Sequence, residues 1–511
     1  MSETAESRHR STGVLVRVLA GIERAGNLLP HPFWLFGILS VLLAVLSWIL
    51  AALGVTAISP ADGETVAVRS LISVEGIGEA VSGVVENFAT FPPLGTALVT
   101  MIGVGMAEKA GLLTTMLRAT VVRVRGRWLT FALAFTAMIA HVASDAAYIV
   151  LIPLGAIVFR AAGRSPVLGI VVALVAISAG TDASPLITPT DVILSGLTTA
   201  AAGTIDPSYV VSPVANYYFS AASSVILSIV ITVVVEGFLA KRVETGEDAE
   251  IEEDRDSLVL TAGQRRGLRR AGIAALVYLL ALAAAVAPPG SPLRGENGSL
   301  LDSPLLSGIA IELSVLFLVA GTAYGTAVGT VRRGRDVPDL ITQGLRDIAP
   351  ILVLFFAVSQ FLAYFKWSKI GEVTAIHGAA LLKSLGAHSL LIFVGILVLV
   401  SLINLLVTSG SAQWALVAPV FVPMLMLLDI PPETTQALYR IADSCTNVIT
   451  PMSPYFVMAL GFLQRYRKSA GIGTLASMTI PLAFSMLIVW TLLFLAWWGL
   501  GLPLGPGAPI R

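Results

Sequence analysis

The stretch RIADSCTNVITPMSPYF, residues 440–456, places an arginine, an aspartate, an asparagine and two prolines inside sequence that is otherwise strongly apolar. A second stretch, SAGTDASPLITPTDVIL at residues 178–194, repeats the Ile-Thr-Pro triplet and carries two aspartates. Proline removes a backbone donor and interrupts a helix, and charged side chains are expensive inside lipid. Two such stretches in one chain predict two helices that are broken within a membrane.

The composition of the chain is that of an integral membrane protein. Its 511 residues are 56% hydrophobic and 13% charged, with a mean hydropathy of +0.86, whereas soluble domains carry about 25% charged residues. A bilayer is crossed by about 20 apolar residues, and long apolar runs occur at residues 33–55, 214–236, 272–287, 305–328, 389–407 and 474–498. The predicted fold class is therefore an all-α polytopic membrane protein. A net charge of zero gives no argument for nucleic acid as a partner, and the single Cys445 excludes an internal disulfide.

The distribution of lysine and arginine predicts how the chain crosses the bilayer. By the positive-inside rule, basic clusters mark cytoplasmic loops and loops poor in bases face outward. This places the N-terminus in the cytoplasm and the C-terminus on the periplasmic or external side, with an odd number of spans, about nine. The expected parts are a cytoplasmic amphipathic leader (1–30), a first transmembrane half (31–240), a charged cytoplasmic linker (241–270) and a second transmembrane half (271–511), each half holding one hairpin or broken helix.

The two halves are related in sequence. SDAAYIVLIPLGAI, residues 144–157, matches GSAQWALVAPVFVP, residues 410–423, in a small polar start, an aromatic residue and a proline at the same spacing. The first matched helix ends at the basic residues 160–164, whereas its counterpart ends in a loop without bases, so the two run in opposite directions. We therefore predict an inverted two-fold internal repeat, which in secondary transporters holds substrate and ions at broken helices. The alternative is that proline and glycine only kink these helices.

Arg440 and Asp443 are three residues apart and share one helical face. One interpretation is a local salt bridge that neutralises both side chains. The other is functional: Arg440 binds a carboxylate in a bidentate manner, while Asp443 carries a proton or coordinates Na⁺. Thr446, Asn447 and Thr450 follow with oxygen atoms of the type that hard cations prefer.

Further polar residues lie at the first break and before the second. Asp182 and Asp191 flank the first Ile-Thr-Pro triplet. In the second half, the small-residue segment TSGSAQW, residues 408–414, is suited to the turn of a re-entrant hairpin, with Asn404 one helical turn before it. Trp414 is compatible with a membrane-interface position, but its place in this segment favours a cavity lining.

Several long stretches carry a resemblance to a known family. SGSAQWALVAPVFVPML, YRIADSCTNVITPMSPYF, VENFATFPPLGTALVTMIGVGMAEKAGLL and ASDAAYIVLIPLGAIVFRAAGRSP resemble the signature stretches of the AbgT family, the p-aminobenzoyl-glutamate transporters. The resemblance runs in the right order from about residue 24 to residue 498. One departure lies before the first Ile-Thr-Pro triplet, where the family has a Ser-Ala-Asn-type stretch and this chain has residues 183–185, Ala-Ser-Pro. The resemblance therefore carries over no ion site that depends on an asparagine there.

The resemblance implies a bacterial inner-membrane homodimer in the lipid bilayer, with nine transmembrane helices and two re-entrant helical hairpins per subunit. It further implies no cofactor, Na⁺ or H⁺ as coupling ion, p-aminobenzoyl-glutamate and related folate catabolites as substrates, and sulfonamide export in some members. Carried over to the matching motifs, the substrate-binding residues are Asp191, Ser411, Trp414, Pro432, Arg440 and Asp443. The ion-coupling residues are Asn404, Asp443, Asn447 and Asp182, with Asn404 and Asp443 as the Na⁺ ligands.

Other function classes fit the sequence less well. The chain has no GxxxxGK[ST] motif, which argues against ATP-driven transport. A channel predicts rings of like charge, whereas the charges here are mixed and concentrated at two breaks. An intramembrane hydrolase with two aspartates sharing a proton is disfavoured by the arginine beside Asp443. We therefore expect a transporter and not an enzyme, with transport of another small carboxylate as the main alternative.

Overall fold

The structure, a computed structural model, describes residues 30–58, 63–121, 126–143, 145–241, 243, 260–295, 298–300, 303–386, 388–450 and 453–511. These residues are predominantly helical, with one two-stranded antiparallel sheet of β1 (Thr56–Ile58) and β2 (Thr65–Ala67), in which Thr56 pairs with Ala67. The helices are α2 (Pro32–Ala52), α3 (Val74–Ser82), α4 (Val84–Ala89), α5 (Pro92–Lys109), α6 (Leu112–Val121), α7 (Leu129–Ala140), α8 (Asp145–Ala161), α9 (Pro166–Gly180), α10 (Pro189–Ala202), α11 (Tyr217–Val234), α12 (Ala262–Val286), α13 (Pro304–Ser307), α14 (Ile309–Val328), α15 (Asp336–Asp347), α16 (Ala349–Trp367), α17 (Ile370–Ser384), α18 (Ser389–Asn404), α19 (Gly410–Met426), α20 (Pro432–Asn447), α21 (Pro454–Tyr466) and α22 (Ile472–Leu500).

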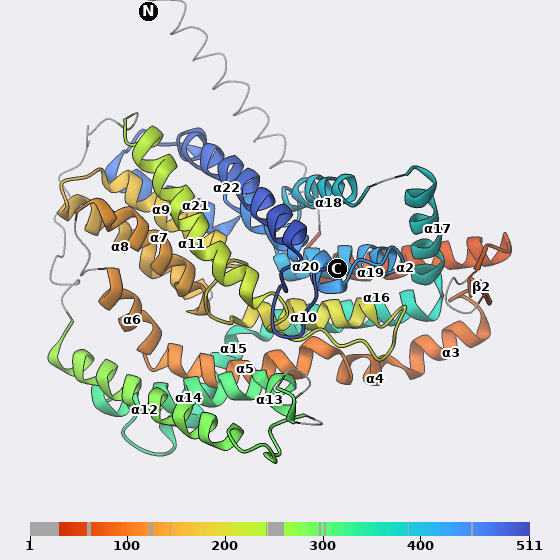
Figure 1. The fold of residues 1–511 in the computed structure, drawn as a ribbon, viewed down its shortest axis with the longest axis horizontal. Coiled ribbons are helices and arrows are strands. Elements are labelled where there is room, and N and C mark those ends of the chain that lie inside the picture. The colour runs from red at the N-terminus through yellow and green to blue at the C-terminus, as the bar shows by residue number, and fades with distance from the viewer. Residues whose placement is uncertain are drawn as a thin grey trace, which may run out of the picture.

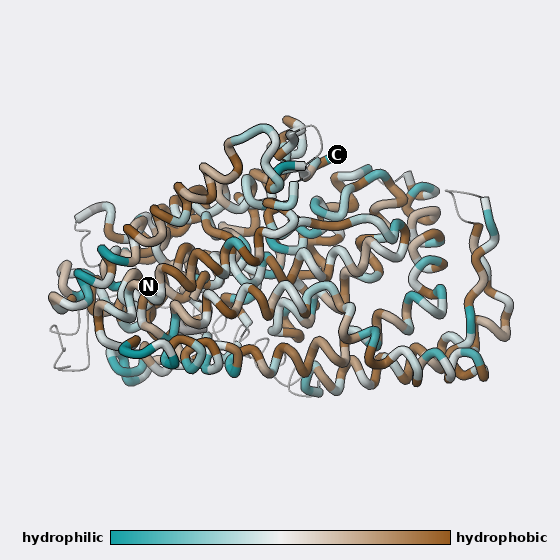
Figure 2. The backbone as a smooth tube through the Cα atoms, turned by 90° about the horizontal axis from the view of Figure 1, so that it is seen from below, coloured by the Kyte–Doolittle hydropathy of each residue, from teal (hydrophilic) through white to brown (hydrophobic). Residues whose placement is uncertain are grey.

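The length and composition of these helices fit a polytopic membrane protein. Among the described residues, α2, α11, α12, α14, α16 and α22 are long and apolar enough to cross a bilayer. Helices α5 and α6 reach that length and apolarity only as a pair, which is bent by 65° at the break between them. Shorter apolar helices, including α7, α8, α9, α18 and α19, lie between them. Figure 2 shows hydrophobic colouring along most helices and hydrophilic colouring at many turns and ends. The predicted all-α membrane class is confirmed, and the number of nine spans stays a prediction.

Helix α9 forms the centre of the first half. Every residue of Pro166–Gly180 is buried, as expected for a helix that is apolar on all sides. Its neighbour α8 approaches very closely, because a Cβ atom on Gly169 would lie only 2.1 Å from the backbone oxygen of Gly155. Small residues permit this close packing of membrane helices. The buried position of α9 fixes where its last residue, Gly180, and the following break lie.

The same order of elements occurs twice in the chain. In the first half α7 and α8 pack on α9, which is broken from α10, and α11 follows; in the second half α18 and α19 pack on α20, which is broken from α21, and α22 follows. Between these groups, α10 packs on α19 and α21 packs on α9. Figure 1 shows α11 and α22 side by side across the front of the molecule. This arrangement brings the break after α9 against α20.

The remaining helices surround this core. Helix α12 packs on α14, and α14 packs on α5, along the lower edge of Figure 1, while α2, α3 and the small sheet lie at the right. In α12 only Gly267 and Ala271 are buried, and large apolar side chains such as Leu276 and Leu280 are exposed. In a membrane such side chains face hydrocarbon, while the helix satisfies its own backbone groups.

The region predicted as a charged linker, residues 241–270, includes the start of a helix. Helix α12 begins at Ala262, so the basic residues 265–270 lie in its first turns. The physical reason is a capping box, in which Thr261 and Gln264 bind each other's backbone N–H groups. The acidic residues 244–259, and the predicted leader 1–30 apart from Pro30, lie outside the described residues.

Candidate functional site

The break between α9 and α10 presents two aspartates. Thr188 caps α10: Thr188 Oγ1 accepts a hydrogen bond from the backbone nitrogen of Asp191 at 3.3 Å. In return, Asp191 Oδ2 accepts from the Thr188 nitrogen at 2.7 Å and from Thr188 Oγ1 at 2.8 Å. Pro189 occupies the first helical position, where its missing N–H has no consequence. The capping box fixes one carboxylate oxygen of Asp191 and leaves Oδ1 for another partner.

Arg440 of α20 pairs with both aspartates of the first break. Arg440 Nη1 lies 2.7 Å from Asp191 Oδ1 and 3.6 Å from Asp182 Oδ1, and the arginine side chain is 1% exposed. Ser444, one turn further along α20, donates to Asp182 Oδ2 at 2.7 Å. The spacing of Arg440 and Asp443 suggested a salt bridge within α20, but the ion pairs that the described residues form at Arg440 are with Asp182 and Asp191. Buried charges require such partners.

Asp443 contacts the tip of the α18–α19 hairpin. Its Oδ2 atom accepts a hydrogen bond from Asn447 Nδ2 at 3.0 Å. A Cβ atom on Gly410, the first residue of α19, would lie 3.2 Å from Asp443 Oδ2 and 3.4 Å from Tyr439 Oη, so the close approach favours glycine. Tyr439 donates from its hydroxyl to the Gly410 oxygen at 2.6 Å. These contacts hold the hairpin tip against α20 next to Asp443.

Asn404 holds the last turn of α20 from the end of α18. The fully buried Asn404 donates from Nδ2 to the backbone oxygen of Asp443 at 2.9 Å, to Thr446 Oγ1 at 2.7 Å and to Asn447 Oδ1 at 3.2 Å. Within the described part of the chain, Asn404 Oδ1 and Asp443 Oδ1 are buried and have no hydrogen-bond partner. No group of three His, Cys, Asp or Glu residues suited to a metal occurs there either. A cation at this place would be held mainly by amide, hydroxyl and single carboxylate oxygens.

Trp414 lies inside the helix bundle, 1% exposed, and not at a lipid-facing surface. Its indole nitrogen donates to Thr198 Oγ1 of α10 at 2.9 Å, and Thr198 donates in turn to Gln436 Oε1 of α20 at 2.6 Å. The indole ring also packs against Tyr439, with ring centroids 4.5 Å apart. Trp414 thus connects three helices one turn from the charged residues.

The two remaining predicted residues, Ser411 and Pro432, lie at different distances from the charged cluster, which consists of Asp182, Asp191, Arg440 and Asp443. Ser411 is half-buried in the first turn of α19, next to Gly410 at the hairpin tip. Pro432 is the first residue of α20, and eight residues at 1.5 Å each put it about 12 Å along the helix axis from Arg440. The structure therefore brings Asp182, Asp191, Arg440, Asp443, Asn404 and Asn447 into one region, with Ser411 beside it, and does not bring Pro432 to the ion pairs.

Sequence reasoning missed four polar residues of this region, namely Thr198, Gln436, Tyr439 and Ser444. A signal for three of them exists, because Gln436 and Ser444 stand four residues before and after Arg440, and Tyr439 stands four before Asp443. Residues at this spacing share a helix face. Thr198 has no comparable signal, since its partners come from two other helices.

A model of the AbgT putative transporter family matches residues 17–511 of the chain. The chain belongs to the AbgT family. It is 40% identical over 487 residues, 95% of each chain, to the p-aminobenzoyl-glutamate transport protein of Escherichia coli (strain K12). The family resemblance found in the sequence is confirmed, and the chain is a membrane transporter rather than an enzyme.

Two solved structures of transporters share the fold of this AbgT-family protein. The YdaH transporter of Alcanivorax borkumensis matches with a TM-score of 0.89 and 39% identity, covering 93% of this chain and 100% of its own. MtrF of Neisseria gonorrhoeae, described as illuminating a class of antimetabolite efflux pumps, matches with a TM-score of 0.90 and 38% identity, covering 96% and 100%.

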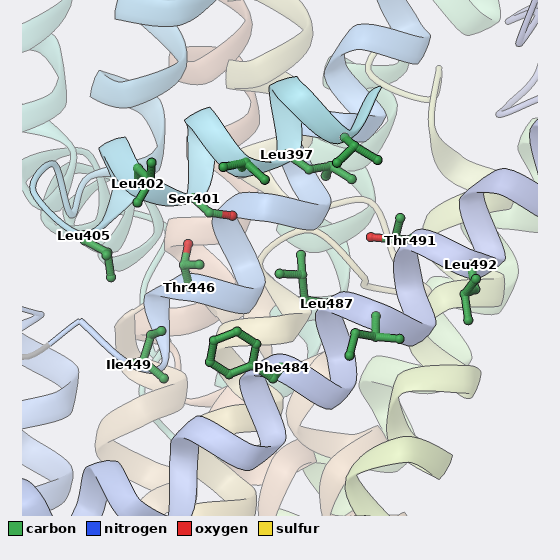
Figure 3. Close-up of a pocket in the computed structure, with 13 residues that line it drawn as sticks. Leu397, Ser401, Leu402, Leu405, Thr446, Ile449, Phe484, Leu487, Thr491 and Leu492 are labelled. Atoms are coloured by element: carbon green, nitrogen blue, oxygen red, sulfur yellow. The ribbon is translucent and has the colours of Figure 1, made fainter. Parts of the chain in front are cut away.

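A cavity of about 470 Å³ lies beside the charged cluster, between α18, α20 and α22 of this AbgT-family protein (Figure 3). Its walls are apolar except for Ser401, Thr446 and Thr491, and Phe484 and Ile488 on its α22 wall are more than half exposed. Among the described residues that line the cavity, Thr446 contacts the charged region, because it accepts a hydrogen bond from Asn404. None of the predicted substrate-binding residues lines it, so we assign the candidate site to the charged cluster and not to this cavity.

Proposed function

We propose that this protein is an ion-coupled secondary transporter of p-aminobenzoyl-glutamate and related folate catabolites, with sulfonamide antimetabolites as further cargo. The name of the Escherichia coli relative supports the first cargo class, and the description of MtrF as one of a class of antimetabolite efflux pumps supports the second. The single observation that carries the proposal is the position of Arg440, which is buried between α9, α10 and α20 and held by aspartates of the other half of the chain. An arginine there is suited to receive a glutamyl carboxylate.

The cluster holds more acids than bases. Asp182, Asp191 and Asp443 are 1%, 9% and 1% exposed, and Arg440 is the cation that pairs with two of them. Buried charge without a partner costs several kcal/mol, so the site gains free energy from a bound cation. This excess of negative charge supports coupling to Na⁺ or H⁺.

The same contacts provide a mechanism for coupling. Arg440 is engaged by Asp191 and Asp182, and a substrate carboxylate must compete with these acids for the guanidinium group. A cation bound at the acids weakens their attraction for Arg440 and frees it for the substrate. By linkage, bound substrate then strengthens cation binding by the same factor.

The aromatic part of the cargo has a complementary surface. The rings of Trp414 and Tyr439 pack with centroids 4.5 Å apart and planes tilted by 33°, one turn from Arg440 and Asp443. Aromatic rings associate with about 0.5–1.5 kcal/mol beyond the burial of area. The p-aminobenzoyl ring fits this surface while the glutamyl tail binds Arg440. Sulfonamides also carry an aryl amine, so the ring surface accepts both cargo types.

The coupling ion in this proposal binds through Asn404 and Asp443. Their buried Oδ1 atoms, which lack hydrogen-bond partners in the described part of the chain, are suitable ligands for Na⁺. Asn447 and Asp182 complete the ion-coupling set. Asn447 holds Asp443 by a hydrogen bond, and Asp182 partly neutralises the charge of Arg440. If H⁺ is the coupling ion, the same carboxylates bind it. No cofactor takes part in the proposed transport.

The proposed architecture is an inverted repeat of nine membrane spans with two re-entrant hairpins, α7–α8 and α18–α19. The matching order of hairpin, broken helix and final helix in the two halves supports it. We further propose a homodimer in the bacterial inner membrane, with the N-terminus in the cytoplasm and the C-terminus in the periplasm. In this arrangement α9 and α20 enter the membrane from opposite sides and end at a common midplane site.

The deciding experiment is flux of radiolabelled p-aminobenzoyl-glutamate into proteoliposomes under separately imposed Na⁺ and pH gradients. We expect flux that follows one gradient and that is abolished by an ionophore for that ion. Flux of other small carboxylates, with none of p-aminobenzoyl-glutamate, would replace the substrate assignment. Flux that does not depend on either gradient would contradict ion coupling.

A further inference from the structure

Tyr148 of α8 and Tyr455 of α21 form a second aromatic pair in the core. Their rings are stacked with centroids 3.9 Å apart and planes inclined by 8°. Tyr148 is 4% exposed, and its hydroxyl lies 3.2 Å from the Ser178 hydroxyl of α9, within hydrogen-bond distance. One ring comes from each half of the chain, and the proposed substrate site uses neither.

The two aromatic pairs lie among different helices near the charged cluster. Ser178 of α9, which lies within hydrogen-bond distance of Tyr148, stands four residues before Asp182. Tyr439, which contacts Trp414, stands four residues before Asp443 in α20. The Trp414 pair is enclosed by α10, α19 and α20, whereas the Tyr148 pair is enclosed by α8, α9 and α21. These two sets have no helix in common. Each of these two sets of helices therefore holds one aromatic pair near the charged cluster.

The sequence supports this correspondence. Tyr148 and Trp414 are the aromatic residues at the same spacing in the two matched segments that begin at residues 144 and 410. Both stand near the start of the second helix of a hairpin, α8 or α19. Each contacts the helix that follows the break of the other half: Trp414 contacts Thr198 of α10, and Tyr148 contacts Tyr455 of α21.

We propose that Tyr148 and Tyr455 form a second aryl-binding subsite, which rests on the proposed function of the charged cluster. The flat ring of the cargo inserts between the two tyrosine rings as it passes between the cluster and the face of the protein that α8 and α21 reach. When the two tyrosine rings are stacked on each other, they obstruct the path of the cargo. An inserted aryl ring contacts one tyrosine on each face, so the lost tyrosine–tyrosine contact is replaced by two new ones. An aliphatic chain makes no such stacking contacts, and the subsite therefore favours aromatic cargo.

The ring planes, and not the hydroxyl groups, carry this selectivity. The contact with Ser178 orients Tyr148, but the stack itself needs only two aromatic rings. Phenylalanine at either position preserves the stack, while leucine removes one ring at similar volume. Comparison of these two substitutions separates the proposed role from general packing.

The experiment measures p-aminobenzoyl-glutamate in two ways: equilibrium binding in detergent and flux in proteoliposomes. Tyr148→Leu and Tyr455→Leu are compared with Tyr148→Phe, Tyr455→Phe and the control Tyr218→Leu, which removes an exposed tyrosine of α11. We expect the leucine variants to bind within about twofold of wild type and to transport roughly two- to tenfold more slowly. That loss corresponds to the roughly 0.5–1.5 kcal/mol of one aromatic pair, at 1.4 kcal/mol per factor of ten. The phenylalanine and control variants keep wild-type flux.

Two results would overturn the subsite. One is wild-type flux in both leucine variants; the other is an equal loss of binding and flux, which would make the tyrosines part of the framework of the charged cluster. Melting in detergent verifies that each variant is folded, and Tyr455, which is only partly buried, provides the measurement if Tyr148→Leu does not fold. Failure of the wild-type protein to bind p-aminobenzoyl-glutamate would instead contradict the proposed function itself.

Discussion

Arg440 Nη1 lies 2.7 Å from Asp191 Oδ1, although 249 residues separate the two in sequence. The pair joins the first helical turn after one break to the middle of α20 in the other half. Because the second oxygen of Asp191 closes the capping box with Thr188, the carboxylate is held from both sides. Movement of α20 relative to α10 must therefore break or replace this ion pair, and a substrate carboxylate is a suitable replacement.

The first prediction separates two roles of Arg440. Arg440→Lys keeps one positive charge beside Asp191 but lacks the planar fork that meets two carboxylate oxygens. We expect binding of p-aminobenzoyl-glutamate to weaken by roughly 1.5–3 kcal/mol, the value of a hydrogen bond to a charged group. Sulfonamides lack the glutamyl carboxylates, and their binding is expected to fall less. Binding of both ligands is measured in detergent for wild type, Arg440→Lys and Arg440→Ala.

Equal losses for the two ligands would mean that Arg440 holds the helices together and does not contact the substrate. Arg346→Lys serves as a matched control, because Arg346 lies in the last turn of α15, far in sequence from the cluster. Its binding of both ligands is expected to equal that of wild type.

The second prediction concerns Asp443 as the carrier of the coupling ion. Asp443→Asn is nearly isosteric and keeps an acceptor for Asn447, but it removes the charge that holds Na⁺ or the group that binds H⁺. We expect gradient-driven flux to be lost while the protein remains folded in size-exclusion chromatography. The control is Asp339→Asn, an exposed aspartate in the first turn of α15. Full coupled transport by Asp443→Asn would reduce Asp443 to a structural hydrogen-bonding group.

The third prediction tests the hydrogen-bond chain from Trp414 through Thr198 to Gln436. Thr198→Val keeps the shape of the side chain but leaves the buried indole N–H and the Gln436 oxygen without a partner. An unsatisfied buried polar group costs about 1–3 kcal/mol, so a lower Tm is expected. Thr198→Ser keeps the hydroxyl and is expected to melt close to wild type. Identical melting of the valine and serine variants would show that the chain contributes nothing to stability.

The fourth prediction concerns the start of α10. Thr188→Ala removes the cap that orders Asp191, and loss of such a cap costs about 0.5–2 kcal/mol. The expected result is a lower Tm together with weaker p-aminobenzoyl-glutamate binding, because Asp191 no longer holds Arg440 in place. Thr188→Ser retains the capping oxygen and should rescue both properties. If alanine lowers the Tm and leaves binding unchanged, the cap has no part in ordering the site.

The sequence predicts the broken helices and most residues of the site because their signals are local. Proline beside aspartate in an apolar stretch identifies the first break, and the spacing of Arg440, Asp443 and Asn447 identifies one face of α20. The partners of Arg440 were not predictable in this way. Spacing favours a neighbour on the same helix, but a long arginine side chain reaches acids on adjacent helices, and only the packing of α9 and α10 against α20 puts Asp182 and Asp191 there.

The same limit explains why Thr198 was missed. A threonine in an apolar helix has no distinguishing pattern, and its importance comes from Trp414 and Gln436 on two other helices. Pro432 is a different case, because the family resemblance alone assigns it to the substrate site. The rise of α20 separates it from Arg440 by about 12 Å along the helix axis, so its part in the site stays a prediction.

The last prediction tests the inverted arrangement of the two halves. Single cysteines are introduced in a Cys445→Ala background at Val210, in the loop between α10 and α11, and at Ser469, in the loop between α21 and α22; both residues are exposed. Thr434 is unsuitable for labelling, since it is fully buried and donates to the Ile510 oxygen. Because the basic residues 465–468 precede Ser469, we expect an impermeant thiol reagent added outside intact cells to label Val210→Cys and not Ser469→Cys. Both sites become reactive after permeabilisation, which serves as the control. Labelling of both cysteines in intact cells would place α9 to α10 and α20 to α21 in the same direction across the membrane, and the inverted repeat would have to be abandoned.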